Sequence, residues 1–174
     1  MIKVVGIRIT DRIKEAGHTQ EILSRHASVI TTRLGFHELT DEICSREACI
    51  ILHLNSERAG LESLLCELNE IGGIELREMN FGGEEYPHDQ NQEEFQLKIL
   101  GILVERNEEV IKDVQRLLTA YGCIIRTRLG VNEDFFDKPA GLIIMELRGD
   151  RAQMDLLEKD LRSVRKVHVQ KMVF

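Results

Sequence analysis

The chain has 174 residues, of which 43% are hydrophobic and 30% are charged, a composition typical of a soluble globular protein. A formal net charge of −7 disfavours general attraction to the phosphates of nucleic acids. Apolar runs such as residues 48–52 are far too short to span a membrane, and Met1 leads directly into an expected strand without a signal peptide, so we expect a cytoplasmic protein.

The sequence contains the same unit twice. The segment Thr32–Gly35, with the sequence Thr-Arg-Leu-Gly, recurs as Thr127–Gly130. At the same offset, Lys3 aligns with Lys98, Gly6 with Gly101 and Gln20 with Gln115. The second copy has a short deletion in the following loop. Beyond that loop, at a slightly smaller offset, Arg58 aligns with Arg151 and Met79 with Met172. Two long copies predict two similar domains, because solenoids and propellers have shorter and more numerous repeats.

In chain order, each copy predicts a strand, a helix, two strands, a second helix and a last strand. Strands are indicated by runs rich in Val and Ile, and helices by apolar residues that recur at three- and four-residue steps. In the first copy the expected elements are strand 2–10, helix 16–26, strands 28–35 and 49–54, helix 61–71 and strand 74–79. In the second copy they are strand 97–105, helix 110–121, strands 123–130 and 142–147, helix 154–164 and strand 167–173.

A βαββαβ order of this length indicates an α+β protein with two tandem ferredoxin-like domains. Such a domain has a four-stranded antiparallel sheet with both helices on one face. We place the first domain at residues 1–81 and the second at 96–174. Residues 82–95, which are acidic and contain glycine and proline, are expected to form a flexible linker.

The first strand of each copy is apolar on both sides. Alternation places Val5 and Ile7 on one side and Val4 and Gly6 on the other, and the second copy repeats this with Gly101 in the place of Gly6. Two helices can cover one side, so the sister domain or another chain is expected to cover the other. A glycine within a strand often permits a close backbone approach. We therefore expect a homo-oligomer, with a dimer favoured.

The repeated Thr-Arg-Leu-Gly segment predicts a candidate ligand site at Arg33, Gly35, Arg128 and Gly130, and the strand glycines Gly6 and Gly101 are further ligand-binding candidates. Strand alternation places Thr32 and Leu34 on the core side and Arg33 on the other side, toward the open sheet face. An arginine there could hold a carboxylate or phosphate through two parallel hydrogen bonds, and the glycine would admit the ligand to the backbone. The alternative interpretation is a salt bridge combined with a turn glycine.

Metal and disulfide sites receive little support. The four cysteines form no Cys-x-x-Cys pair and are expected to be reduced and mostly buried. None of the six histidines has a histidine at its repeat partner. Cys49 and His53 share a strand face, but their Cα atoms would lie about 13 Å apart, too far for one ion within a chain. A metal site shared between chains through His37 or His53 remains an alternative.

Several enzyme and RNA-binding classes are disfavoured by missing motifs. The chain has no phosphate-binding loop, no dinucleotide-binding glycine turn and no hydrolase nucleophile elbow. The expected first and third strands have no aromatic residue on which RNA bases could stack. No pattern indicates a nucleophile with its base, so we expect no catalysis and no cofactor.

The first copy resembles a known family. The resemblance rests on the start Gly6–Arg12, the segment Ile22–His26, the segment Val29–Gly35, the run Ile50–Leu54 before helix 61–68, and the end Ile71–Ile74. These segments are similar to those of the iron-only hydrogenase system regulators, an ACT-like group related to the C-terminal domain of the nickel-responsive repressor. The second copy resembles the same group more loosely, through Gly101, Thr127–Gly130 and residues 161–167.

The resemblance implies ACT-like domains in an oligomeric regulatory protein that senses a small molecule. This chain departs from the group because it is a tandem, and we expect no DNA-binding extension. Arg33 and Gly35 occupy the region where the nickel repressor has its second-strand histidines, so nickel binding is not carried over. We expect a small anionic ligand at a domain or subunit interface, with no direct binding of nucleic acid or membrane. The alternatives are a ligand-free oligomerisation module and a metal-responsive regulator.

Overall fold

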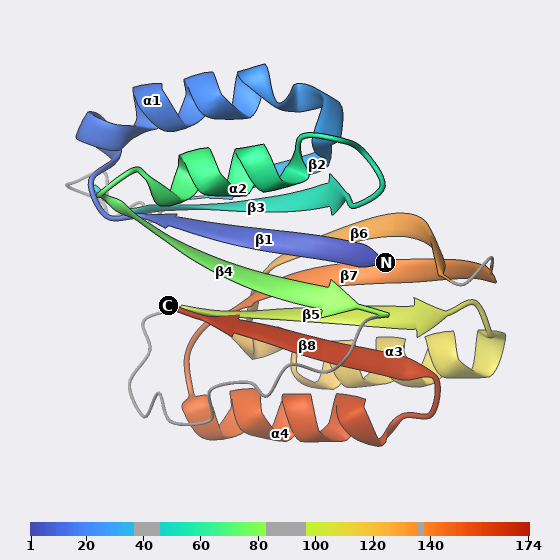
Figure 1. Ribbon diagram of the computed structural model, residues 1–174. Coiled ribbons are helices and arrows are strands. Elements are labelled where there is room, and N and C mark those ends of the chain that lie inside the picture. Colours follow the sequence, from blue (N-terminus) through green and yellow to red (C-terminus); the bar gives the residue numbers. More distant parts are fainter. Residues whose placement is uncertain (37–45, 83–96, 136–137) are drawn as a thin grey trace. The chain divides into compact units, whose positions relative to one another are not determined.

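The computed structural model describes residues 1–36, 46–82, 97–135 and 138–174, which form two compact units, Met1–Asn80 and Phe81–Phe174. Each unit follows the order βαββαβ, with two α-helices on one face of its own four-stranded sheet (Figure 1). The expected linker at 82–95 lies, apart from Gly82, outside the described residues.

The first unit carries one sheet with the strand order β2-β3-β1-β4. Strand β3 runs antiparallel to both β1 and β2. The elements of this unit are β1 (Ile2–Ile9), α1 (Arg12–Arg25), the 3₁₀ turn η1 (Ala27–Val29), β2 (Ile30–Phe36), β3 (Ala48–Asn55), α2 (Leu61–Asn69) and β4 (Ile74–Phe81).

The second unit repeats this arrangement with the strand order β6-β7-β5-β8. Its elements are β5 (Lys98–Glu105), α3 (Glu108–Ala120), the 3₁₀ turn η2 (Gly122–Ile124), β6 (Ile125–Phe135), β7 (Lys138–Leu147), α4 (Arg151–Ser163) and β8 (Val167–Val173). Strand β5 pairs antiparallel with β7 and β8, and β6 with β7. The expected α+β architecture of two ferredoxin-like folds is therefore confirmed. Strands β6 and β7 are longer than the strands 123–130 and 142–147 that the sequence predicts.

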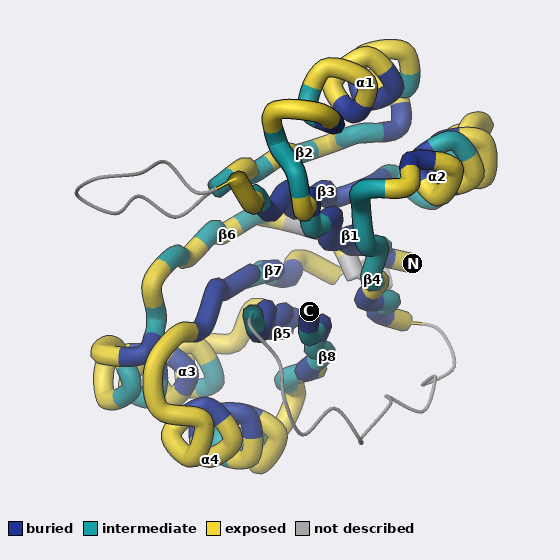
Figure 2. Tube along the Cα trace, turned by 90° about the vertical axis from the view of Figure 1, so that its left-hand side faces the viewer, coloured by how far each residue is buried: buried dark blue, intermediate teal, exposed yellow. Residues whose placement is uncertain are grey.

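Each unit has its own hydrophobic core between its helices and its sheet. In the first unit Val5, Ile7 and Leu52 of the sheet pack with Leu64 of α2. The second unit builds the corresponding core from its own strands and helices, including Leu157 of α4. Each helix is accordingly buried along one side and exposed along the other (Figure 2). No helix in the described part of the chain is long and apolar enough to cross a membrane.

The helix starts differ between the units. Helix α3 begins after Asn107, whose side-chain oxygen accepts hydrogen bonds from the backbone N–H groups of Glu109 and Val110. Helix α4 begins after Asp150, which accepts from Ala152 in the same way. These side chains satisfy backbone donors that the first helical turn leaves unpaired. The residues before α1 and α2 make no such bond.

The sheet face opposite the helices is also apolar, as the alternation predicts. On this face Gly6 pairs with Ile51 in the first unit, and Gly101 pairs with Ile144 in the second. The two strand glycines thus lie on the helix-free faces.

Candidate functional site

A β-bulge sets the direction of the Arg33 side chain. The pairing of β2 with β3 shifts its register between Ile30 and Thr32. Beyond the shift, Arg33 lies opposite Leu52, a residue of the helix-side core. Residues directly opposite each other on antiparallel strands point to the same face of the sheet. Arg33 therefore faces its own helices, and the prediction that it points to the open face, with Thr32 and Leu34 in the core, is wrong.

The second unit repeats this geometry. The register of β6 against β7 shifts between Ile125 and Thr127, and Arg128 then lies opposite Met145, a core residue. The repeat has thus retained the bulge as well as the residues that follow it. Arg128 also faces its own helices rather than the helix-free face.

Each arginine binds a glutamine of the first helix in its unit. The guanidinium of Arg33 donates to the Gln20 side-chain oxygen at 2.7 Å, and that of Arg128 donates to Gln115 at 3.4 Å. The two glutamines are themselves repeat partners. This pair, hereafter the Gln–Arg tie, joins the first helix to the edge strand in both units. The sequence displayed all four residues, but it gave no reason to connect the glutamines with the arginines.

The glycines of the repeated segment lie beside the Gln–Arg tie. Gly35 pairs with Ile50 and Gly130 with Ile143, so both glycines face the helices as their neighbouring arginines do. A Cβ atom added at either glycine would meet no other atom within 4 Å. The structure therefore brings Arg33 together with Gly35, and Arg128 with Gly130. It does not bring Gly6 or Gly101 to them, because these lie on the opposite faces.

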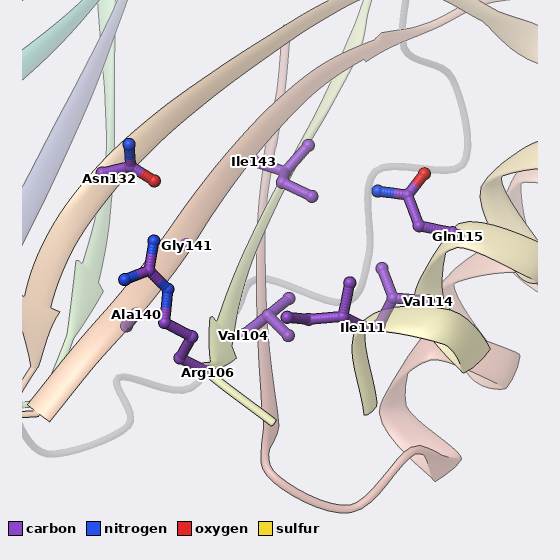
Figure 3. Close-up of a pocket in the computed structure, with 9 residues that line it drawn as sticks. All are labelled: Val104, Arg106, Ile111, Val114, Gln115, Asn132, Ala140, Gly141 and Ile143. Atoms are coloured by element: carbon purple, nitrogen blue, oxygen red, sulfur yellow. The ribbon is translucent and has the colours of Figure 1, made fainter. Parts of the chain in front are cut away.

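In the second unit the space beside this strand opens into a pocket of about 250 Å³. The pocket lies between α3 and the helix-facing side of β6 and β7 (Figure 3). It is lined by Val104, Arg106, Ile111, Val114, Gln115, Asn132, Ala140, Gly141 and Ile143. Gln115 connects the pocket to the Gln–Arg tie, since the same side chain accepts the hydrogen bond from Arg128.

The pocket combines an apolar wall with a polar rim. Val104, Val114 and Ile143 supply buried or half-buried hydrocarbon. Arg106 and Asn132 are exposed at the rim, and Figure 3 shows the Arg106 side chain extending toward the strand that carries Gly141. A few polar groups over an apolar lining are typical of small-molecule sites.

Arg106 is positioned by its backbone, which leaves its side chain available. Its N–H donates to the carbonyl of Pro139 at 3.1 Å, and the following residue, Asn107, caps α3. Its guanidinium has no hydrogen-bond or ion-pair partner within the part of the chain that the structure describes. Arg106, Asn132 and Gly141 are not repeated in the first copy, so the repeated residues of the sequence do not point to them.

A buried charge cluster on the helix side of the second unit has a structural role. The Lys98 ammonium lies 2.9 Å from carboxylate oxygens of both Asp155 and Glu158, and its side chain is 2% exposed. Burial by itself would raise the pKa of Glu158, but the hydrogen bond and charge of Lys98, with the charges of Lys171 and Arg162, outweigh it and lower that pKa. Every charge in this cluster is opposed by another, which leaves no open position for a ligand.

The structure gives no support to a metal centre within the described residues. No group of three or more His, Cys, Asp or Glu side chains there could hold an ion. His37 lies outside the described residues. Cys49 is buried, but Cys66 and Cys123 are exposed, so the expectation that the thiols are mostly buried is wrong for these two.

Comparison with known proteins finds fold neighbours but no sequence family. No family model and no curated protein matches the chain. An uncharacterized protein from Thermotoga maritima is 22% identical over 47% of this chain and 99% of its own, with a TM-score of 0.39. The acetolactate synthase small subunit from Thermotoga maritima is 10% identical over 100% of this chain and 98% of its own, with a TM-score of 0.36.

The regulatory subunit of aspartate kinase from Thermus flavus is 13% identical over 94% of this chain and 90% of its own, with a TM-score of 0.37. At these identities and TM-scores, none of the similarities carries an argument about the function of this chain.

Proposed function

We propose that the protein is a non-enzymatic regulator with two ACT-like domains that senses a small molecule. The observation that carries the proposal is the pocket of the second unit, in which an available arginine stands at the rim of an apolar wall. Its lining holds no nucleophile with a neighbouring base, as a covalent or acid–base mechanism would need. The resemblance to the iron-only hydrogenase system regulators points to the same class of function.

The site that supports this proposal lies inside one unit. The sequence led us to expect a ligand at a domain or subunit interface, near Arg33 and Arg128. In both units these arginines make the Gln–Arg tie, and Gln115 then lines the pocket. We therefore assign Arg128 a positioning role for Gln115 and place the ligand between α3, β6 and β7.

A thermal-shift screen tests the proposal against its alternatives. The panel contains amino acids, aliphatic carboxylates, nucleotides and divalent metal ions. A ligand that binds the folded state raises the melting temperature by an amount that grows with its concentration. We expect a shift with at least one small organic anion. A shift with metal ions alone would support a metal-responsive regulator, and no shift with any compound would support a ligand-free oligomerisation module.

The oligomeric state is a separate proposal. Apolar residues on the helix-free side of the sheets, such as Val4, Ile51, Leu103 and Ile144, are buried within the single chain, so they need no partner chain to cover them. The proposal of a homodimer therefore rests on the resemblance to oligomeric ACT-like regulators. Light scattering over a wide range of concentrations tests it. A monomeric mass throughout would contradict this prediction.

A further inference from the structure

The two copies differ at the positions that form the pocket. The first-unit residue that aligns with Arg106 is Asp11, whose carboxylate accepts a hydrogen bond from Arg46 at 2.6 Å. The apolar wall of the pocket also differs between the units. The first unit has Thr19 at the position of Val114 and Ala48 at the position of Gly141. Within the described residues, the rim therefore has an unpaired arginine in the second unit, whereas the aligned residue of the first unit belongs to an ion pair.

We propose that the second unit alone binds one small aliphatic carboxylate per chain, with its carboxylate on Arg106 and its hydrocarbon part against Val104, Val114 and Ile143. This inference rests on the proposed function and names its ligand class and its unit. A volume of about 250 Å³ corresponds to roughly eight water molecules at about 30 Å³ each. The ligand is accordingly a molecule of about eight non-hydrogen atoms.

The chemistry of the rim favours a carboxylate over other anions. A guanidinium matches a carboxylate through two parallel hydrogen bonds. A phosphate carries more charge and more acceptor oxygens than a single arginine can satisfy, and the other rim groups, Asn132 and Gln115, are neutral amides. These amides can bind a hydroxyl, oxo or amino group next to the carboxylate. The apolar wall excludes a ligand that is polar throughout, since burying an unpaired polar group is unfavourable.

The first unit lacks the anion-binding group. The residue aligned with Arg106 is Asp11, and its carboxylate forms an ion pair with Arg46. Desolvation opposes this, but the hydrogen bond and charge of Arg46 lower the pKa of Asp11 below its ordinary value. The Arg46 guanidinium is therefore already bound to a carboxylate of its own chain. The asymmetry predicts a stoichiometry of one ligand per chain, although the fold contains two similar units.

Titration calorimetry and NMR on the full chain test the inference with isovalerate and 4-methyl-2-oxopentanoate as probes. Saturation at one equivalent per chain is expected. Arg106→Met removes the guanidinium and keeps much of the apolar stem, so it should weaken binding roughly tenfold or more, as expected for a lost charged hydrogen bond. The uncharged probe isovaleramide should bind the parent protein weakly and be unaffected by Arg106→Met.

A pair of matched substitutions places the site in one unit. A Cβ at Gly141 meets no atom within 4 Å, so Gly141→Val should fold and fill part of the pocket. It should abolish binding, whereas Ala48→Val at the aligned first-unit position should leave the affinity unchanged. If Gly141→Val fails to fold, probe-induced NMR shifts in the parent protein take its place. They should be largest for the Gly141 amide and the methyl groups of Val114 and Ile143.

The possible outcomes separate this inference from the proposed function. Two equivalents per chain, unchanged affinity in Arg106→Met, or shifts centred on the first unit would overturn the inference and leave small-molecule sensing in place. Failure of both carboxylates to bind, while another compound of the screen does bind, would also overturn the ligand class alone. If no compound in the screen binds the chain, the proposed function fails as well.

Discussion

At the scale of single residues, the two copies pair an aligned lysine with different carboxylates. Lys3 and its repeat partner Lys98 both lie on the first strand of their unit, facing the helices. Lys3 pairs with Glu78 of β4, whereas Lys98 pairs with Glu158 of α4. The residue that aligns with Glu78 is Lys171, which also binds Glu158. The carboxylate partner of the lysine thus lies on a strand in the first unit and on a helix in the second.

Removing the Glu158 charge is expected to destabilise the second unit. Glu158→Gln leaves Lys98 buried with Asp155 as its remaining carboxylate, and Asp155 is 72% exposed. Breaking one side of a buried ion pair costs a few kcal/mol, so we expect a loss of about 2 kcal/mol in unfolding free energy. Urea denaturation measures it, with Glu78→Gln as the matched and milder control. A double variant, Lys98→Met with Glu158→Leu, should recover most of the loss.

The same carboxylate predicts a pH dependence. The pKa of Glu158 in the folded state lies below its ordinary value of 4.5. A lowered pKa means that ionised Glu158 stabilises the fold above pH 4.5, and that this contribution disappears as the pH falls through the folded-state pKa. The stability difference between the parent and Glu158→Gln should therefore be largest near neutral pH and shrink as the pH falls below 4.5. A difference that stays constant as the pH falls well below 4.5 would show that the charge of Glu158 is not its cause.

At the scale of secondary-structure elements, the sequence predicts the order of strands and helices. It does not predict which side chains of β2 and β6 face the helices. Apolar periodicity indicates all four helices and the long strands, because burial of one side dictates it. Counting alternate residues from Ile30 places Thr32 with the core. The bulge after Ile30 adds one residue and reverses every side chain that follows, including Arg33. Nothing in the residue types marks that bulge.

The start of α3 offers a test at the same scale. Asn107→Ala removes the acceptor for the backbone N–H groups of Glu109 and Val110. Loss of such a cap costs about 1 kcal/mol and should speed hydrogen exchange in the first turn of α3. Asn107→Asp is the control, since it keeps a side-chain oxygen that can accept from the same N–H groups. It should leave exchange in the first turn of α3 nearly unchanged.

At the scale of the whole molecule, the repeat predicts the fold better than it predicts the site. Positions that both copies share, such as Gln115 and Arg128, form the Gln–Arg tie that the fold uses twice. The rim of the pocket depends instead on Arg106, where the copies differ. Selecting candidates by repetition therefore favours structural residues. The structure identifies Arg106 as a candidate because it lines the pocket together with residues of α3, β6 and β7.

Separate cores predict that the two units respond separately to matched substitutions. Leu64 and Leu157 occupy aligned positions, each is 0% exposed, and each packs within the core of its own unit. Replacing either by Ala removes buried methyl groups and leaves a cavity, at a cost of about 2–5 kcal/mol. We expect Leu157→Ala to speed hydrogen exchange for core amides of β5 and β7, and Leu64→Ala to do so for β1 and β3. Equal loss of protection in both units from either substitution would show instead that the chain unfolds as a single cooperative unit.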